Sequence, residues 1–172
     1  MNAKYWIHKL DLLKHPEGGY YKEIYRSEEV IPLEALPDRY LDKRNVSTSI
    51  YFMLDKEQVS HFHKLQSDEI WHFYYGVSLT IHMIDESGNY SIQKLGRNLD
   101  EGEALQFVIP KCTWFAAEVN DKKSFSLIGC TVAPGFDFTD FELAKREELI
   151  KQFTLLKEII ERFTANIDGN TD

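Results

Sequence analysis

The chain has 172 residues, 43% of them hydrophobic and 28% charged, which is typical of one globular domain rather than of a disordered segment. Its 28 acidic and 20 basic residues give a formal net charge of −8, and no run of basic residues exceeds a pair. Nucleic acids and anionic membranes bind to basic faces, so this charge excludes both as expected partners.

The first residues contain no apolar h-region, and no apolar run approaches the roughly 18 residues of a membrane span. The two cysteines are too few for a disulfide framework in a chain of this length. We therefore expect a cytoplasmic protein whose thiols are reduced.

Three segments precede the main run of strands. Apolar residues spaced by three and four predict a short helix over residues 3–13. A turn at residues 17–19 leads into an aromatic strand at Tyr20–Arg26. Residues 28–44 show no clean period and are expected to form a long loop.

From residue 46 to residue 134 the pattern is that of β-strands. Apolar and polar residues alternate over 77–85, and a hairpin turn is expected at 86–89. The expected strands are 46–54, 69–75, 77–85, 90–95, 105–109, 114–119 and 124–133. Strands this short and evenly spaced indicate a sandwich, a jelly roll or a closed barrel.

The end of the chain changes to a helical period. The apolar residues that share one stripe are Leu149, Phe153, Leu156, Ile160, Phe163 and Ile167. They predict a single helix over about 140–167, and Thr139 with Glu142 is expected to form a capping box at its start. The stripe is expected to dock on the β-barrel, with a partner helix as the alternative.

The stretch from residue 60 to residue 76 carries the most informative polar residues. His61 and His63 are one residue apart, so on a regular strand both imidazoles would share a face. Glu69 begins the next expected strand, and a tight turn would return its carboxylate to the histidines. Two imidazoles and a carboxylate are a common ligand set for Zn, Mn, Fe or Ni, and can also serve as a general base with the group that orients it. The alternative is that these histidines are exposed or satisfied within the core.

This stretch resembles the first motif of the cupin superfamily, His-x-His followed by Glu and then Gly. The loop between His63 and Glu69 is one residue longer than the family pattern, and the spacing from Glu69 to the next Gly matches it. In the second cupin motif, Cys112 stands where the family has Gly, and Phe115 stands where it has a fourth metal ligand, His. The implied ligand set is therefore incomplete, which leaves open both a metal held by His61, His63 and Glu69 and a metal-free pocket.

Several further segments are similar to the DUF985 (Cupin_5) family of cupins, over about residues 5–155. They are His15–Tyr20, Tyr25–Ser27, Ile50–Phe52, His61–His72, Trp114–Ala117, Ala133–Phe138 and Phe141–Leu143. The resemblance implies an all-β fold, the cupin double-stranded β-helix or jelly-roll barrel, close to epimerases of the dTDP-4-dehydrorhamnose 3,5-epimerase type. We expect one domain over 1–172, with the barrel over about 17–138, a short N-terminal helix and a longer C-terminal helix. The resemblance also implies a homodimer.

Four residues are expected to bind a ligand in the barrel pocket. Trp71 shares a strand face with Glu69, together with Phe73 and Tyr75 as pocket wall or core, and Phe115 is expected to face inward by its motif position. An aromatic lining would stack against a sugar ring or a nucleobase.

The other two are His72 and Arg26. His72 is out of phase with Glu69 and reaches the pocket only through a bulge. Arg26 is a candidate for binding an anionic group such as phosphate, with an ordinary salt bridge as the alternative.

Three functions are compatible with these residues. The first is a pocket that binds a small polar metabolite, for example a sugar or a sugar nucleotide. The second is an epimerase or isomerase in which His61 or His63 is the base and Glu69 orients it, although the buried His–Asp dyad of the epimerases is not visible in the local sequence. The third is a metal-dependent cupin enzyme with a His2Glu site.

Overall fold

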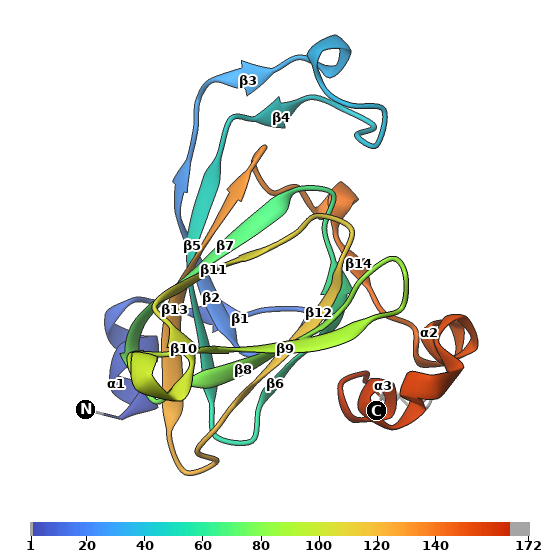
Figure 1. Ribbon diagram of the computed structural model, residues 1–172. Helices are drawn as coiled ribbons and strands as arrows, with labels where there is room; N and C mark the ends of the chain where they lie inside the picture. The colour runs from blue at the N-terminus through green and yellow to red at the C-terminus, as the bar shows by residue number, and fades with distance from the viewer. Residues whose placement is uncertain (1, 166–172) are drawn as a thin grey trace, which may run out of the picture.

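The computed structural model describes residues 2–165 and consists of two facing six-stranded sheets that enclose a barrel (Figure 1). The first sheet has the order β1 (Leu13–Lys14), β2 (Tyr20–Arg26), β5 (Thr48–Asp55), β13 (Phe125–Ala133), β7 (Asp68–Gly76) and β11 (Gln106–Ile109). The second has the order β10 (Glu103–Ala104), β9 (Tyr90–Leu95), β8 (Leu79–Ile84), β12 (Trp114–Val119), β6 (Val59–Lys64) and β14 (Glu142–Leu143). The expected all-β jelly roll is confirmed, and its strands extend from residue 13 to residue 143, beyond the expected bounds 17–138.

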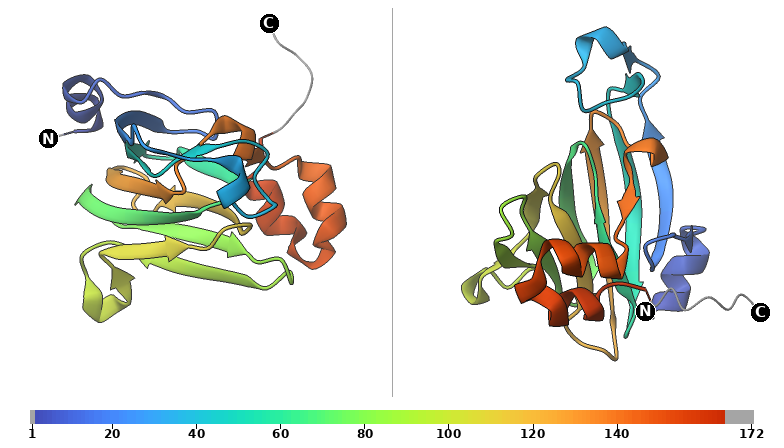
Figure 2. Two further views of the ribbon diagram at one scale, coloured as in Figure 1. Left: turned by 90° about the horizontal axis from the view of Figure 1, so that it is seen from above. Right: turned by 90° about the vertical axis from the view of Figure 1, so that its right-hand side faces the viewer.

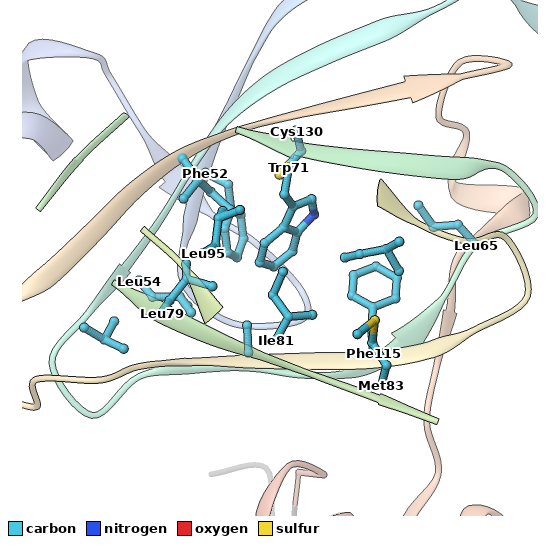
Figure 3. Packing of buried hydrophobic residues seen from close by; sticks show 14 of the residues in the cluster. Phe52, Leu54, Leu65, Trp71, Leu79, Ile81, Met83, Leu95, Phe115 and Cys130 are labelled. Carbon is cyan, nitrogen blue, oxygen red and sulfur yellow. The ribbon is translucent and has the colours of Figure 1, made fainter. Parts of the chain in front are cut away.

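The inner faces of the two sheets bury one apolar core, because alternate residues of each strand point inward. Trp71 lies in the middle of this core, with ring centroids 6.1 Å from Phe52 and 6.0 Å from Phe115 (Figure 3). Phe73 packs against the same core. Tyr75 does not, because a bulge shifts the register between Leu127 and Ile128 of the neighbouring strand β13. Its ring lies 5.2 Å from that of Trp6, on the outer side of the sheet.

Helices cover parts of both outer faces (Figure 2). Helix α1 (Ala3–Lys9) packs with Leu12 on β5 and β13 of the first sheet. The C-terminal segment covers the second sheet, where Phe62, Ile84 and Trp114 meet its apolar stripe. His82, on the polar side of β8, is also buried beneath this segment, with its ring 4.5 Å from that of Phe163.

The C-terminal segment is not one helix. It forms α2 (Arg146–Gln152), a 3-10 turn η4 (Thr154–Leu156) and α3 (Lys157–Arg162), and Ile167 lies outside the described residues. Phe153 breaks the helix with φ −129° and ψ 66°, and this bend lets both α2 and α3 bury apolar residues on the sheet. The expected capping box is also wrong, because Thr139 lies in the 3-10 turn η3 (Phe138–Asp140) and Glu142 in β14.

The expected long loop over 28–44 contains a two-stranded arm, β3 (Val30–Ile31) and β4 (Arg44–Asn45), with a 3-10 turn η1 (Leu33–Ala35) between them. The arm projects beyond one end of the barrel (Figure 1). Its base is tied to η3 by Arg44, whose Nε and Nη2 lie 2.6 and 2.5 Å from the two carboxylate oxygens of Asp140. Among residues 2–165, no helix has the length and apolar character needed to cross a bilayer.

Candidate functional site

A partly enclosed cavity of about 280 Å³ lies between the sheets at the end of the barrel that carries the arm. Its apolar walls are Tyr21, Ile50, Phe52, Leu65, Trp71, Val132, Phe136, Phe138 and Phe141. Its polar lining is His15, Glu17, Glu23, Arg26, Thr48, His63, Glu69 and Cys130. A few polar groups among aromatic walls are typical of a small-molecule site.

Glu17 lies on the loop between β1 and β2, and its carboxyl group contacts three polar side chains. Its Oε1 accepts a hydrogen bond of 2.8 Å from Ser60 Oγ, and its Oε2 lies 3.1 Å from His63 Nε2 and 3.3 Å from His15 Nδ1. The loop passes so close to β6 that a Cβ on Gly18 would lie 2.1 Å from the Val59 carbonyl oxygen. Gly18 also has a φ of 109°, so only glycine allows this approach.

The hydrogen bonds of His63 determine how it shares a proton with Glu17. His63 Nδ1 lies 2.7 Å from the His61 carbonyl oxygen, which only accepts, so Nδ1 carries the proton. In the neutral imidazole Nε2 is then an acceptor, and its contact with Glu17 Oε2 requires one further proton between the two atoms. The pair is therefore either a carboxylic acid with a neutral imidazole or a carboxylate with an imidazolium.

Burial favours the neutral form of this pair. It raises the pKa of Glu17 well above its usual value, and the nearby charge of Glu69 raises it further, against the opposing hydrogen bond from Ser60. Burial also lowers the pKa of His63 to about 3, and that of His15 to about 4. These shifts favour the form in which Glu17 is a neutral acid that donates to His63 Nε2.

Glu69 is the second buried carboxyl of the cavity, with 8% of its surface exposed. Burial raises its pKa to about 7, and the nearby Trp71 indole and Cys130 thiol partly oppose this shift. The Trp71 N–H is nevertheless too far or too poorly aligned for a regular hydrogen bond, since Nε1 is buried with no such partner in the described chain. Glu69 therefore changes charge near neutral pH while facing the cavity.

Of the three expected catalytic residues, the cavity brings together His63 and Glu69 but not His61. A bulge in β6 places both His61 and Phe62 opposite Ala116, between the pairs His63–Phe115 and Ser60–Ala117. His61 therefore leaves the alternation, and its Nδ1 donates a hydrogen bond of 2.8 Å to the Glu17 carbonyl oxygen.

The expected metal-ligand set is consequently not assembled. No group of three or more His, Cys, Asp or Glu side chains in residues 2–165 is arranged to hold a metal ion. The residues present do not fit a His2Glu metal centre, because the His61 imidazole is hydrogen-bonded to the Glu17 backbone and does not line the cavity with His63 and Glu69.

The four expected binding residues have different positions. Trp71 lines the cavity, whereas Phe115 lies behind His63 with its ring centroid 4.0 Å away, in the apolar core. His72 points to the outer side of the first sheet, where its Nε2 lies 3.2 Å from Thr131 Oγ1, because no bulge occurs between it and Glu69.

Arg26 lies at the mouth of the cavity, but its guanidinium is already engaged. Glu23 accepts from its Nε and Nη2 at 3.0 and 2.7 Å, and Nη1 donates at 3.0 Å to both the Asn45 side chain and the Phe136 carbonyl. Arg26 thus positions Phe136 in the cavity wall, and the salt-bridge alternative holds rather than a free anion-binding group.

Sequence reasoning missed the roles of Glu17 and His15. Both belong to the segment His15–Tyr20 that carries part of the family resemblance, and the two consecutive glycines after Glu17 were a signal of a close chain approach. Glu17 and His63 are 46 residues apart in the sequence, so no local motif could reveal the pair.

Comparisons with known proteins agree with this architecture. The family described as "Cupin superfamily (DUF985)" matches residues 4–144. An uncharacterised protein of Saccharomyces cerevisiae is 30% identical over 154 residues, which are 84% of this chain and 76% of that protein.

Solved structures give the same result. A protein of Shewanella oneidensis is 41% identical with a TM-score of 0.86, over 96% of this chain and 98% of that one. A hypothetical protein of Leishmania major is 30% identical with a TM-score of 0.87, over 96% of this chain and all of that one. Oxalate decarboxylase of Bacillus subtilis, at 16% identity and a TM-score of 0.53, over 91% of this chain and 40% of that one, shares the fold alone.

Proposed function

Because this chain belongs to the DUF985 family of the cupin superfamily, we propose that its barrel cavity binds a small polar metabolite about the size of a sugar ring. The observation that carries the proposal is Glu69, a buried carboxyl that faces the cavity and ionises near neutral pH. Burying such a group costs free energy, and a cost of this kind is typical of functional sites.

The walls of the cavity support a ring-shaped ligand. Phe136, Phe138 and Phe141 form one aromatic wall, with ring centroids 5.0 to 6.3 Å apart, and Trp71 and Phe52 lie deeper. Flat apolar surfaces stack well against the apolar face of a sugar ring, and the polar groups of the cavity can form hydrogen bonds with its hydroxyl groups.

Native mass spectrometry of the protein, as purified and after incubation with a small-molecule cell extract, tests this proposal. We expect a bound small molecule in the wild type and none in Val132→Phe, which fills the cavity from a wall position. Circular dichroism checks that the variant is folded. An unliganded mass for the wild type under both conditions, or an equal adduct on Val132→Phe, would contradict cavity binding.

A second candidate, acid–base isomerisation next to a carbonyl, is favoured by the Glu17–His63 pair. The buried carboxyl–histidine pair that the local sequence lacks is formed here by distant residues. In this scheme Glu69, not a histidine, takes the proton from the carbon, the C–H electron pair forms a C=C bond to the carbonyl carbon, and the C=O π pair moves to the oxygen. The Glu17 O–H would turn from His63 Nε2 to donate a hydrogen bond to that oxygen, and return of the proton to carbon regenerates both groups.

Incubation with 4-keto sugars in deuterated water tests the second candidate. We expect deuterium at the carbon next to the carbonyl by NMR, with loss of exchange in Glu69→Gln and a slower rate in Glu17→Gln. Exchange no faster than in buffer would remove the isomerase and leave the binding function.

A further inference from the structure

We propose that the metabolite held in this cavity carries a protonated amino group, which binds to Glu69. The proposal rests on the binding function proposed above and names the ligand class: a small organic cation, such as an amino sugar or another ring-bearing amino alcohol. It follows from the partners of the charged side chains that line the cavity.

Within residues 2–165, Arg26 provides the one guanidinium that lines the cavity, and its charge is balanced by Glu23. Arg26 forms two hydrogen bonds with the Glu23 carboxylate, and its Nη1 donates to two further oxygens. A phosphate or carboxylate ligand would have to displace Glu23, and the freed carboxylate would then face the same mouth. The cavity therefore disfavours an anionic metabolite, including the diphosphate of a sugar nucleotide.

The two histidines provide no positive charge either. Desolvation keeps both His15 and His63 neutral, and His63 Nε2 accepts a hydrogen bond from the Glu17 carboxyl. The Glu17–His63 pair is thus electrically neutral and satisfied internally, with Ser60 completing the hydrogen bonds of the carboxyl group.

Glu69 remains without a cationic partner. No Lys, Arg or His side chain within residues 2–165 forms an ion pair with it, although it is more than nine-tenths buried and lines the cavity. The neighbouring Trp71 N–H, also buried, has no hydrogen-bond partner in the same part of the chain. Trp71 and Cys130 are neutral groups near this carboxylate, so the site offers an anion without a countercharge, which the ammonium group of a ligand would provide.

The surrounding surfaces suit an organic cation better than a metal ion. Ring faces attract cations, and Trp71, Phe52 and Phe141 all contribute to the lining. A divalent metal ion instead needs several oxygen, nitrogen or sulfur ligands in a fixed geometry, and the described residues provide no such group.

Three probes with the same six-membered ring test the charge of the ligand: cyclohexylammonium, cyclohexanol and cyclohexanecarboxylate. Isothermal titration calorimetry at pH 8, where Glu69 is ionised, measures their affinities. We expect the ammonium to bind about tenfold more tightly than the alcohol, because it adds a charge-assisted hydrogen bond to the same ring, and the carboxylate to bind most weakly.

Two charge-matched variants locate the effect. Glu69→Gln is expected to abolish the preference for the ammonium over the alcohol. Glu142→Gln removes an equal charge from β14, outside the cavity, and is expected to keep the preference. Retention of the preference in Glu69→Gln would overturn the assignment to this carboxyl.

The failures of the two proposals are distinguishable. An alcohol that binds as tightly as the ammonium, or a carboxylate that binds best, would overturn the cationic ligand and leave cavity binding intact. Absence of binding by all three probes at millimolar concentrations would contradict the cavity-binding function as well.

Discussion

The two ends of the barrel are built from the same strands but differ in what their inward side chains do. Along β5, Thr48 and Phe52 line the cavity, and Leu54 is completely buried beyond them. Along β7, Glu69 faces the cavity, and Phe73 packs into the core. The hollow end and the packed end are thus separated by only a few residues on each strand.

The difference shows that the backbone of this fold does not itself create the site. At the packed end Leu79, Ile81, Leu95 and Val119 have no exposed surface, and they fill the space between the sheets. At the hollow end polar side chains and ion pairs replace this packing. We therefore expect stability to depend on apolar volume at one end and on polar pairing at the other.

The largest effect is expected from a leucine at the packed end. Leu54→Ala should lower the free energy of unfolding by about 4 kcal/mol, because it leaves a cavity in a close-packed region. Leu65→Ala, a matched change in the cavity wall, should cost less than half as much, since its surroundings are already open. Urea denaturation measures both, and equal costs would contradict the division of the barrel into two ends.

The next effect tests the polar pairing of the hollow end. Arg44→Met should cost about 3 kcal/mol, because it leaves the Asp140 carboxylate buried without its partner. Adding Asp140→Asn should restore most of this stability by removing the unpaired charge. If Arg44→Met alone costs as little as an exposed ion pair, under about 1 kcal/mol, polar pairing does not hold this end together.

Much of the packed end could be predicted from the sequence, because strand periodicity is a local property. The alternation over residues 77–85 and the aromatic run after Glu69 both predicted strands that the structure contains. The single C-terminal helix was wrong, because a helical stripe does not reveal that the sheet beneath it requires a bend at Phe153.

The hollow end was harder to predict from the sequence, because its geometry depends on bulges and on contacts between distant residues. Spacing alone placed His61 beside His63, but the β6 bulge turns it toward the Glu17 backbone. Glu17 becomes a site residue only when the loop before β2 folds against β6. The strand pattern and the family resemblance both pointed to Glu69, and neither showed which residue would pair with His63.

An effect of similar size should appear in the pH dependence of stability. Glu69 has a pKa of about 7 in the folded protein against a usual value of 4.5, so folding is favoured while it is protonated. Relative to Glu69→Gln, the wild type should lose about 3 kcal/mol of stability as the pH rises from about 4.5 through 7.

The difference between the two proteins is the quantity to measure, by urea denaturation at pH 4.5 and pH 8. His15 and His63 have lowered pKa values, so their contribution to stability rises with pH over part of the same range. This contribution is common to wild type and variant, and it cancels in the difference. If the difference in the free energy of unfolding does not change with pH, burial does not raise the pKa of Glu69.

The smallest effect is expected from Glu17→Gln, and it decides which form the Glu17–His63 pair takes. If Glu17 is a neutral acid, the amide can still donate to His63 Nε2 and accept from Ser60, so the free energy of unfolding should change by less than about 1 kcal/mol. Glu17→Ala should cost about 1–3 kcal/mol, because it leaves both partners unsatisfied. NMR of the imidazole nitrogens should find His63 protonated on Nδ1 alone in both wild type and Glu17→Gln. An imidazolium in the wild type would instead mean that the hollow end contains a buried ion pair, with Glu17 as a second permanent anion beside Glu69.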